Sequence, residues 1–146
     1  MGFLLIWIYR SEIRMAICDP IADMLTRIRN AGKAKLNNVD IPASKLKAEL
    51  AKVFKNEGFI KNYKFIKDDK QGILRVYLKY GQNQSSAIYG IEMVSKPGRR
   101  TYIKNSKIKP VLGGMGVAVL TTSKGVMTDK RAAKENLGGE VLCKIW

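Results

Sequence analysis

The sequence predicts an α+β fold with two lobes, and three observations lead to this prediction. Residues 15–80 contain two stretches with the apolar spacing of helices and three with the character of strands. Residues 87–146 contain mostly short strand-like stretches separated by tight-turn residues. Between them, residues 81–86 form a polar segment without an apolar side chain, where we place the lobe boundary. We expect an α/β first lobe and a mainly β second lobe.

The first lobe opens with a helix that we expect to begin at Pro20 and to stop near Gly32. Asp19 is the candidate N-cap, and proline is well suited to the first helical position. Apolar side chains recur at the spacing that places them on one buried stripe of this helix, namely Ile21, Leu25 and Ile28. A short strand is expected at 39–41, followed by Pro42.

The rest of the first lobe is predicted to be a second helix and a β-hairpin. Ser44 caps the helix, Gly58 ends it, and the apolar stripe is formed by Leu46, Leu50, Val53 and Phe54. Strands at 59–65 and 73–80 flank a turn at 68–72. The second of these strands alternates apolar with basic or aromatic residues, which predicts one core face and one wet, basic face.

The second lobe is predicted from strands, turns and one short helix. In chain order we expect a strand at 88–94, a Pro-Gly type II turn at 95–98, a return strand at 99–103, strands at 117–120 and 126–128, a helix at 129–136 capped by Asp129, and a strand at 141–145. Gly138 and Gly139 turn the chain into that last strand.

The charge of the chain indicates the chemistry of its partner. The 146 residues include 27 Lys and Arg against 12 Asp and Glu, which gives a formal net charge of +15. Hydrophobic residues make up 46% of the chain, enough for a packed core rather than a disordered chain. An excess of positive charge repels itself within a small folded protein, so a polyanionic partner is expected. Nucleic acid and an acidic membrane surface are the candidates.

Composition and motifs argue against an enzyme. The chain has no histidine, which excludes Ser-His-Asp and Cys-His nucleophile systems and histidine-containing metal sites. Its two cysteines, Cys18 and Cys143, lack zinc-site spacing and are interpreted as reduced, buried residues. Residues 113–116 lack the third glycine of a dinucleotide loop and precede a strand, and the acidic residues are scattered. We therefore expect no catalytic site, metal or cofactor.

The basic residues are distributed along the chain in four clusters. These are Arg27, Arg29, Lys33 and Lys35; Lys45, Lys47, Lys52 and Lys55; Lys96, Arg99, Arg100 and Lys104; and Lys130, Arg131 and Lys134. One such cluster is typical of a solvated surface. Four clusters in a folded chain with few acids indicate an extended footprint for a polyanion.

The stretch from Thr121 to Thr128 is the most distinctive candidate for recognition. Hydroxyl groups donate and accept hydrogen bonds, which suits base edges and the RNA 2′-hydroxyl. Gly125 would allow close backbone approach, and Lys124 would contact a phosphate. Spacing alone leaves a second interpretation equally open, a Ser/Thr-rich β-turn with no ligand.

Residues 1–14 differ from the rest of the chain. Residues 3–9 are an apolar run that is too short to span a bilayer as a helix, and Met15 opens a segment that resembles a natural start. We interpret 1–14 as an extension or a mispredicted start. An anchor for a membrane-surface protein remains the alternative, just as an RNA-processing enzyme remains an alternative explanation of the charge.

Six blocks carry a resemblance to a known family: DPIADMLTRIRNA at 19–31, PASKLK at 42–47, EGFI at 57–60, VSKPGRR-Y at 94–102, TSKGVMTD at 122–129 and LGGE at 137–140. With these blocks in order, residues 15–146 resemble the bacterial-type small-subunit ribosomal protein S8 family. The resemblance implies a structural protein that binds the central domain of small-subunit ribosomal RNA and helps assemble it. It also implies neighbouring small-subunit ribosomal proteins as partners, a cytoplasmic location with an organelle left open, and binding to the mRNA of its own operon.

The resemblance also implies which residues contact RNA. The specific contacts would come from the hydroxyl-rich loop and its flanks, namely Thr121, Thr122, Ser123, Lys124, Gly125, Tyr102 and Glu140. Arg99 and Arg100 lie in a matching block. The first lobe would touch a second RNA region through Arg29, Asn30, Ser44, Lys45 and Lys47.

Overall fold

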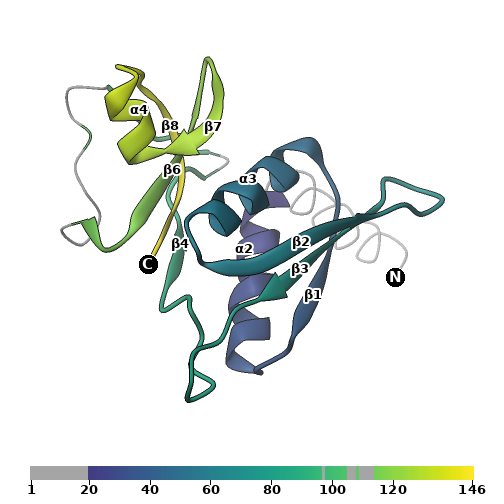
Figure 1. Cartoon of the computed structure of the whole chain (residues 1–146). Helices are drawn as coiled ribbons and strands as arrows, with labels where there is room; N and C mark the ends of the chain where they lie inside the picture. The colour runs from purple at the N-terminus through teal and green to yellow at the C-terminus, as the bar shows by residue number, and fades with distance from the viewer. Residues whose placement is uncertain (1–19, 97, 105–107, 109–113) are drawn as a thin grey trace, which may run out of the picture.

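A computed structural model describes residues 20–96, 98–104, 108 and 114–146, and it confirms the α+β class (Figure 1). In chain order its elements are α2 (Pro20–Lys33), β1 (Asn38–Pro42), α3 (Lys45–Asn56), β2 (Ile60–Ile66), β3 (Ile73–Leu78), β4 (Ile91–Met93), β5 (Tyr102–Ile103), β6 (Val117–Thr122), β7 (Gly125–Thr128), α4 (Asp129–Lys134) and β8 (Gly139–Ile145). The predictions for residues 1–14, Met15, Cys18 and Asp19 concern positions outside these described residues.

The first lobe is a three-stranded antiparallel sheet in the order β1-β3-β2, covered by α2 and α3. The predicted alternation of β3 is confirmed, because Leu74, Val76 and Leu78 are buried and the residues between them are half-exposed. The open face carries an ion pair across the strands, in which Arg75 Nε donates to Asp40 Oδ1 at 2.7 Å. That hydrogen bond lowers the pKa of Asp40 from its usual value.

The two long helices begin and end largely as predicted. Ser44 caps α3, since its Oγ accepts from the backbone N–H of Lys47 at 3.2 Å. The stripe on α2 is buried as expected, and the helix runs one residue past Gly32. Beyond it, Leu36 N–H donates to Ala31 O at 3.0 Å, and Lys35 takes a φ of +55° at the position where helices usually carry glycine.

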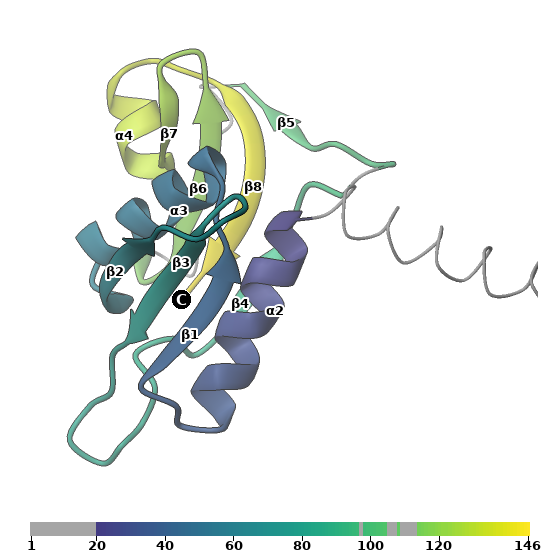
Figure 2. The ribbon, with the colours of Figure 1, turned by 90° about the vertical axis from the view of Figure 1, so that its right-hand side faces the viewer.

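The second lobe is a five-stranded antiparallel sheet in which β8 is the central strand. Its order is β4-β8-β6-β7, and β5 also pairs with β8. Figure 2 shows α4 beside β6 and β7, and β5 lying along β8. Between α4 and the sheet lies a small apolar cluster formed by Ala118, Leu120, Met127, Ala132 and Val141.

Two predictions about this lobe are wrong. The strand expected at 99–103 does not return along the preceding strand, because β4 and β5 both pair antiparallel with β8 and therefore run the same way. The N-cap of α4 is Thr128 rather than Asp129, since Thr128 Oγ1 accepts from Arg131 N–H at 3.2 Å. Asp129 is instead buried as the first residue of the helix.

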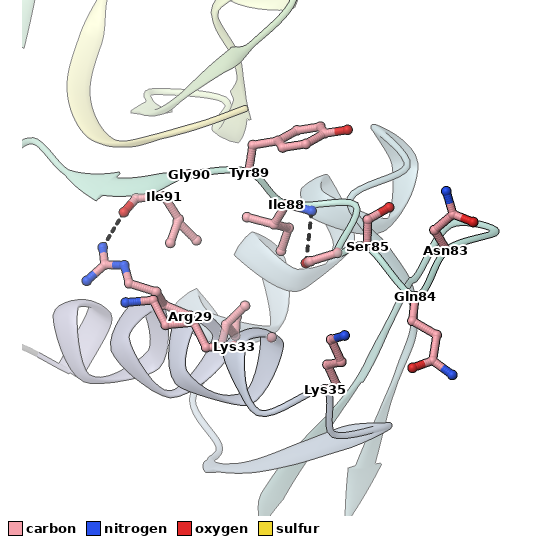
Figure 3. A pocket seen from close by; sticks show the side chains of 13 residues that line it. Arg29, Lys33, Lys35, Asn83, Gln84, Ser85, Ile88, Tyr89, Gly90 and Ile91 are labelled. Atoms are coloured by element: carbon pink, nitrogen blue, oxygen red, sulfur yellow. Dashed lines mark hydrogen bonds between the residues drawn. The ribbon is translucent and has the colours of Figure 1, made fainter.

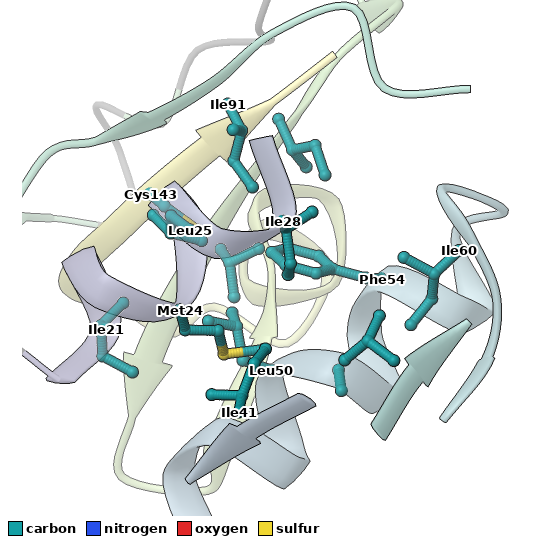
Figure 4. Close-up of a cluster of buried hydrophobic side chains, with 14 of the residues drawn as sticks. Ile21, Met24, Leu25, Ile28, Ile41, Leu50, Phe54, Ile60, Ile91 and Cys143 are labelled. Carbon is teal, nitrogen blue, oxygen red and sulfur yellow. The ribbon is translucent and has the colours of Figure 1, made fainter. Parts of the chain in front are cut away.

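The main hydrophobic core joins the two lobes. Ile21, Leu25 and Phe54 from the first lobe belong to the same buried cluster as Val119 and Cys143 from the second. Figure 4 shows Cys143 of β8 beside Leu25 of α2. Burial raises the pKa of the Cys143 thiol to about 12. The shared core fixes the second sheet against the helices of the first lobe.

Candidate nucleic-acid interface

The hairpin of β6 and β7 holds the hydroxyl-rich stretch. Thr122 pairs with Gly125 across the hairpin, and Ser123 and Lys124 form the turn between them. Thr122 Oγ1 donates to Gly125 O at 2.9 Å and accepts from Lys124 N–H at 3.2 Å. Gly125 has a φ of +109°, a conformation that other residues rarely adopt. The hydroxyl of Thr122 and the glycine therefore shape the turn.

The neighbouring side chains leave their polar groups free. Ser123 and Lys124 are exposed and Thr121 is half-exposed, and among the described residues none of the three makes a side-chain hydrogen bond or ion pair. The β-turn interpretation is confirmed at Thr122, and recognition of a ligand stays a prediction for the other positions. Thr122 belongs to a β-turn, whereas Thr121, Ser123 and Lys124 are available to a ligand.

A row of residues runs across the sheet beside this hairpin. Tyr102 on β5 pairs with Glu140 on β8, Glu140 with Thr121 on β6, and Thr121 with Val126 on β7. Directly opposed residues in antiparallel strands project from the same face, so these four side chains form one surface, which we call the recognition row. Tyr102 is 72% exposed. The register thus brings together three residues that the sequence places 19 positions or more apart.

A basic loop projects next to the recognition row. Backbone hydrogen bonds between Lys96 and Arg99 close its tip, at 3.0 and 2.9 Å. At its base, the buried Ser95 hydroxyl accepts from Thr101 N–H at 2.9 Å and donates to Thr101 O at 3.3 Å. We call Lys96, Gly98, Arg99 and Arg100 the basic loop. The tip is closed between Lys96 and Arg99, one residue beyond the predicted 95–98 turn, and the predicted turn type depends on Pro97, which lies outside the described residues. The chain leaves this loop along β8.

Arg100 connects the basic loop to the row. Its Nη1 donates to Glu140 Oε1 at 3.2 Å, where the Arg100 side chain is 52% exposed and that of Glu140 only 16%. Glu140 is therefore neutralised and held in place by Arg100. Arg99 and Lys96 are exposed, and in the described part of the chain their charged groups have no acidic partner. The surface is consequently positive beside an aromatic ring and free hydroxyl groups.

The candidates of the first lobe occupy other elements and share no hydrogen bond with the row among the described residues. Asn30 and Lys45 are exposed, and Ser44 uses its hydroxyl as the cap of α3. The Arg29 guanidinium donates to the backbone carbonyl of Ile91 and so connects α2 to β4. Arg29 thus serves the packing of the lobes as well as the surface.

Lys47 is buried, although the sequence placed it in a basic cluster and the family resemblance implied an RNA contact. It is 5% exposed, and its Nζ donates to Pro42 O at 2.9 Å. Burial lowers the pKa of its ammonium group. The spacing contained a signal for this placement, because Lys47 precedes Leu50, Ala51 and Phe54 by three, four and seven positions on the buried stripe.

Sequence reasoning missed two residues that shape the interface. A Cβ at Gly139 would overlap the backbone carbonyl of Thr121, so only glycine lets β8 approach β6 beside the row. Ser95 is fully buried and closes the basic loop. The glycine pair had indicated only a turn, and a serine next to a Pro-Gly turn carries no sign of burial.

The described residues form neither a metal site nor a membrane-spanning helix. Among the described residues, no group of histidine, cysteine or acidic side chains is arranged to hold a metal ion. The helices within the described ranges are also too short or too polar to cross a membrane.

Comparison with known proteins gives the family. Residues 19–146 match the family model described as ribosomal protein S8. The "small ribosomal subunit protein uS8" of Geobacter sulfurreducens is 60% identical over 132 residues, which cover 90% of this chain and all of that protein. The proteins of the same name from Desulfitobacterium hafniense and Syntrophobacter fumaroxidans are 58% and 56% identical over the same coverage. The chain therefore belongs to the ribosomal protein S8 family, a family of structural, non-enzymatic proteins.

Proposed function

We propose that this protein is a constituent of the small ribosomal subunit that binds the central domain of small-subunit ribosomal RNA and helps assemble it. The observation that carries the proposal is the recognition row, where free hydroxyl groups lie beside the exposed Tyr102 ring and the basic loop. Relatives that share more than half of their residues with this chain are named small ribosomal subunit proteins.

Attraction and recognition come from different residues in this proposal. The lysines and arginines of the four clusters, except the buried Lys47, displace counterions from RNA, which gives a salt-sensitive and sequence-independent attraction. Regular A-form RNA hides its base edges in a deep groove, so specific contacts need an irregular shape. Thr121 and Ser123 then donate to or accept from base edges and 2′-hydroxyls, and Tyr102 stacks on an unpaired base.

The supporting residues hold this surface in shape. Thr122 and Gly125 set the turn that presents Ser123, and Lys124 lies beside it to meet a phosphate. Glu140 orients Arg100 toward the row. No step of this scheme makes or breaks a covalent bond.

A second RNA contact through the first lobe is part of the proposal. The exposed Asn30 and Lys45 are its candidates, with Arg29 and Ser44 contributing the parts of their side chains that remain accessible. Lys47 contributes through the fold of α3 and its loop, since its ammonium group is bonded to Pro42 O.

The test is binding of the purified full chain to a transcript of the central domain. Ser123→Ala should weaken binding by about 1–3 kcal/mol, roughly 5- to 150-fold, because a hydrogen-bonding partner is removed from the surface. Asn56→Ala, which removes an exposed polar group at the end of α3, is the control and should leave the affinity unchanged. Equal affinities of the two variants would contradict the assignment.

The contribution of charge is measured separately. Lys124→Ala should lower the slope of log affinity against log salt by about one charge. Lys64→Ala removes an exposed lysine on β2 that lies outside the four clusters, and this matched control should change the slope less. An unchanged slope for Lys124→Ala would remove its phosphate contact from the proposal.

The same surface would bind any RNA of the same irregular shape. Binding to the mRNA of the protein's own operon follows if that mRNA mimics the ribosomal site, and a competition assay between the two RNAs tests it. The proposal places the protein in the cytoplasm within small ribosomal subunits, in contact with neighbouring subunit proteins.

A further inference from the structure

A second basic surface lies in a pocket between the end of α2 and the segment that connects the two lobes. The pocket has a volume of about 640 Å³ and is lined by α2, Lys35, residues 83–86 and residues 88–91 (Figure 3). None of the recognition-row or basic-loop residues lines it. It is therefore separate from the recognition row and the basic loop, and it shares Arg29 with the second RNA contact proposed for the first lobe.

The charges around this pocket all have the same sign. Arg29 and Lys33 come from α2, and Lys35 follows the helix. No Asp or Glu is among the lining residues, and in the described part of the chain Lys33 and Lys35 have no acidic partner. An anionic group is the ligand that such a lining favours.

The remaining walls suit a nucleobase. Ile28 and Ile88 contribute apolar side chains to the lining, and Asn83 and Ser85 contribute an amide and a hydroxyl. Tyr89 also belongs to the lining and is 84% exposed. Aromatic rings without a protein partner are platforms on which unpaired bases stack, next to cations that follow the phosphates.

The backbone of the pocket is strained at two residues. Lys35 and Gln84 have φ values of +55° and +57°, which L-residues other than glycine and asparagine rarely adopt. Glycine at position 35 would terminate α2 without strain. A lysine kept there at a cost in stability indicates that its charge has a use in the pocket.

We propose that this pocket binds one unpaired nucleotide of an RNA, with the base stacked on Tyr89 and the phosphate between Lys33 and Lys35. Asn83 and Ser85 hydrogen-bond the edge of the base. The assignment of RNA as the source of the nucleotide rests on the proposed function, while the chemistry of the pocket stands on its lining. The site would give the first lobe a point contact in addition to the recognition row.

Trp146 provides a reporter for the test. Its ring packs against Gly90, a residue of the pocket lining. The full chain with Trp7→Phe leaves it as the only tryptophan. Its fluorescence is titrated with single-stranded hexauridylate, with uridine 5′-monophosphate, with inorganic phosphate and with a hexaglutamate peptide.

We expect hexauridylate to bind most tightly of these four ligands. Tyr89→Ala should weaken that binding about tenfold, whereas Tyr89→Phe keeps the ring and the affinity. Lys35→Gly should weaken binding while raising the melting temperature, a combination that a purely structural residue does not produce. A matched loss of charge outside the pocket, Lys61→Gly, should not weaken it.

Three outcomes would overturn the proposal. If Tyr89→Ala does not weaken hexauridylate binding, no base stacks on Tyr89. If uridine 5′-monophosphate binds as tightly as hexauridylate, RNA is not the source of the nucleotide. If hexaglutamate binds as tightly as hexauridylate, the site is one for an acidic protein segment. Binding of the central-domain transcript distinguishes a failure of the proposed function from a failure of the pocket proposal. Insensitivity of its binding to Ser123→Ala refutes the recognition row, and the hexauridylate response in the pocket does not depend on that result.

Discussion

Thr122 and Ser123 are adjacent hydroxyl residues, and only the Thr122 hydroxyl forms hydrogen bonds within the turn among the described residues. Thr122→Val removes the hydroxyl that donates to Gly125 O and accepts from Lys124 N–H, at 2.9 and 3.2 Å. Each such hydrogen bond contributes about 0.5–1.5 kcal/mol net to stability. Because the turn is half-exposed, water replaces part of what is lost, and the expected loss is about 1–2 kcal/mol. Ser123→Ala breaks no bond among the described residues and should change stability by less than about 0.5 kcal/mol.

Urea and thermal denaturation followed by circular dichroism measure the difference. For a chain of this size, the loss from Thr122→Val corresponds to a fall of roughly 3–8 °C in melting temperature. Thr26→Val, an exposed position on α2, controls for replacing a hydroxyl by a methyl group. Central-domain RNA binding is then measured where each variant is folded, and Ser123→Ala should lose affinity at unchanged stability. Equal destabilisation by the two variants, or none by Thr122→Val, would refute the division of roles.

Three further predictions concern Gly139, Lys47 and Cys143. Gly139→Ala should lower the free energy of unfolding by at least about 2 kcal/mol in urea, because its Cβ overlaps the Thr121 carbonyl, and a neutral result would contradict the close approach of β8 to β6. Lys47→Ala should cost about 2 kcal/mol in the same assay, through its buried stem and its bond to Pro42 O, with little effect on RNA affinity per folded molecule. Cys143, with a pKa raised to about 12, should resist iodoacetamide at pH 8 until urea unfolds the chain, tested by mass spectrometry with the other cysteine replaced by serine. Rapid labelling of Cys143 in the folded protein would refute its burial.

Local periodicity was sufficient for the first lobe. The stripe on α2, the Ser44 cap and the alternation of β3 are properties of neighbouring residues, so the sequence displays them directly. The second lobe depends on pairing over distance. The Pro-Gly turn predicted a hairpin, but β4 and β5 form their ladders with β8, about 40 residues or more further along the chain. Nothing in the local pattern specifies that partner.

The candidate site shows the same division between residue type and placement. The hydroxyl-rich stretch was predictable from composition, because few other segments of the chain carry so many short polar side chains. Which hydroxyl shapes the turn and which stays free depends on the hairpin register, which the residue types do not reveal. Lys47 was misplaced for a related reason, since charge suggested the surface while its long stem lets the ammonium group reach Pro42 O.

The central position of β8 has a consequence for the order in which the protein becomes functional. The strand follows β4, β5 and β6 in the chain, yet all three pair with it, and it carries Glu140 of the recognition row. During synthesis the second sheet cannot close before this strand has emerged from the translating ribosome. A chain cut short before Gly139 would lack both the strand that completes the sheet and the carboxylate that holds Arg100. If the recognition row binds RNA as proposed, a chain that ends before Gly139 should not compete with the full chain for that RNA.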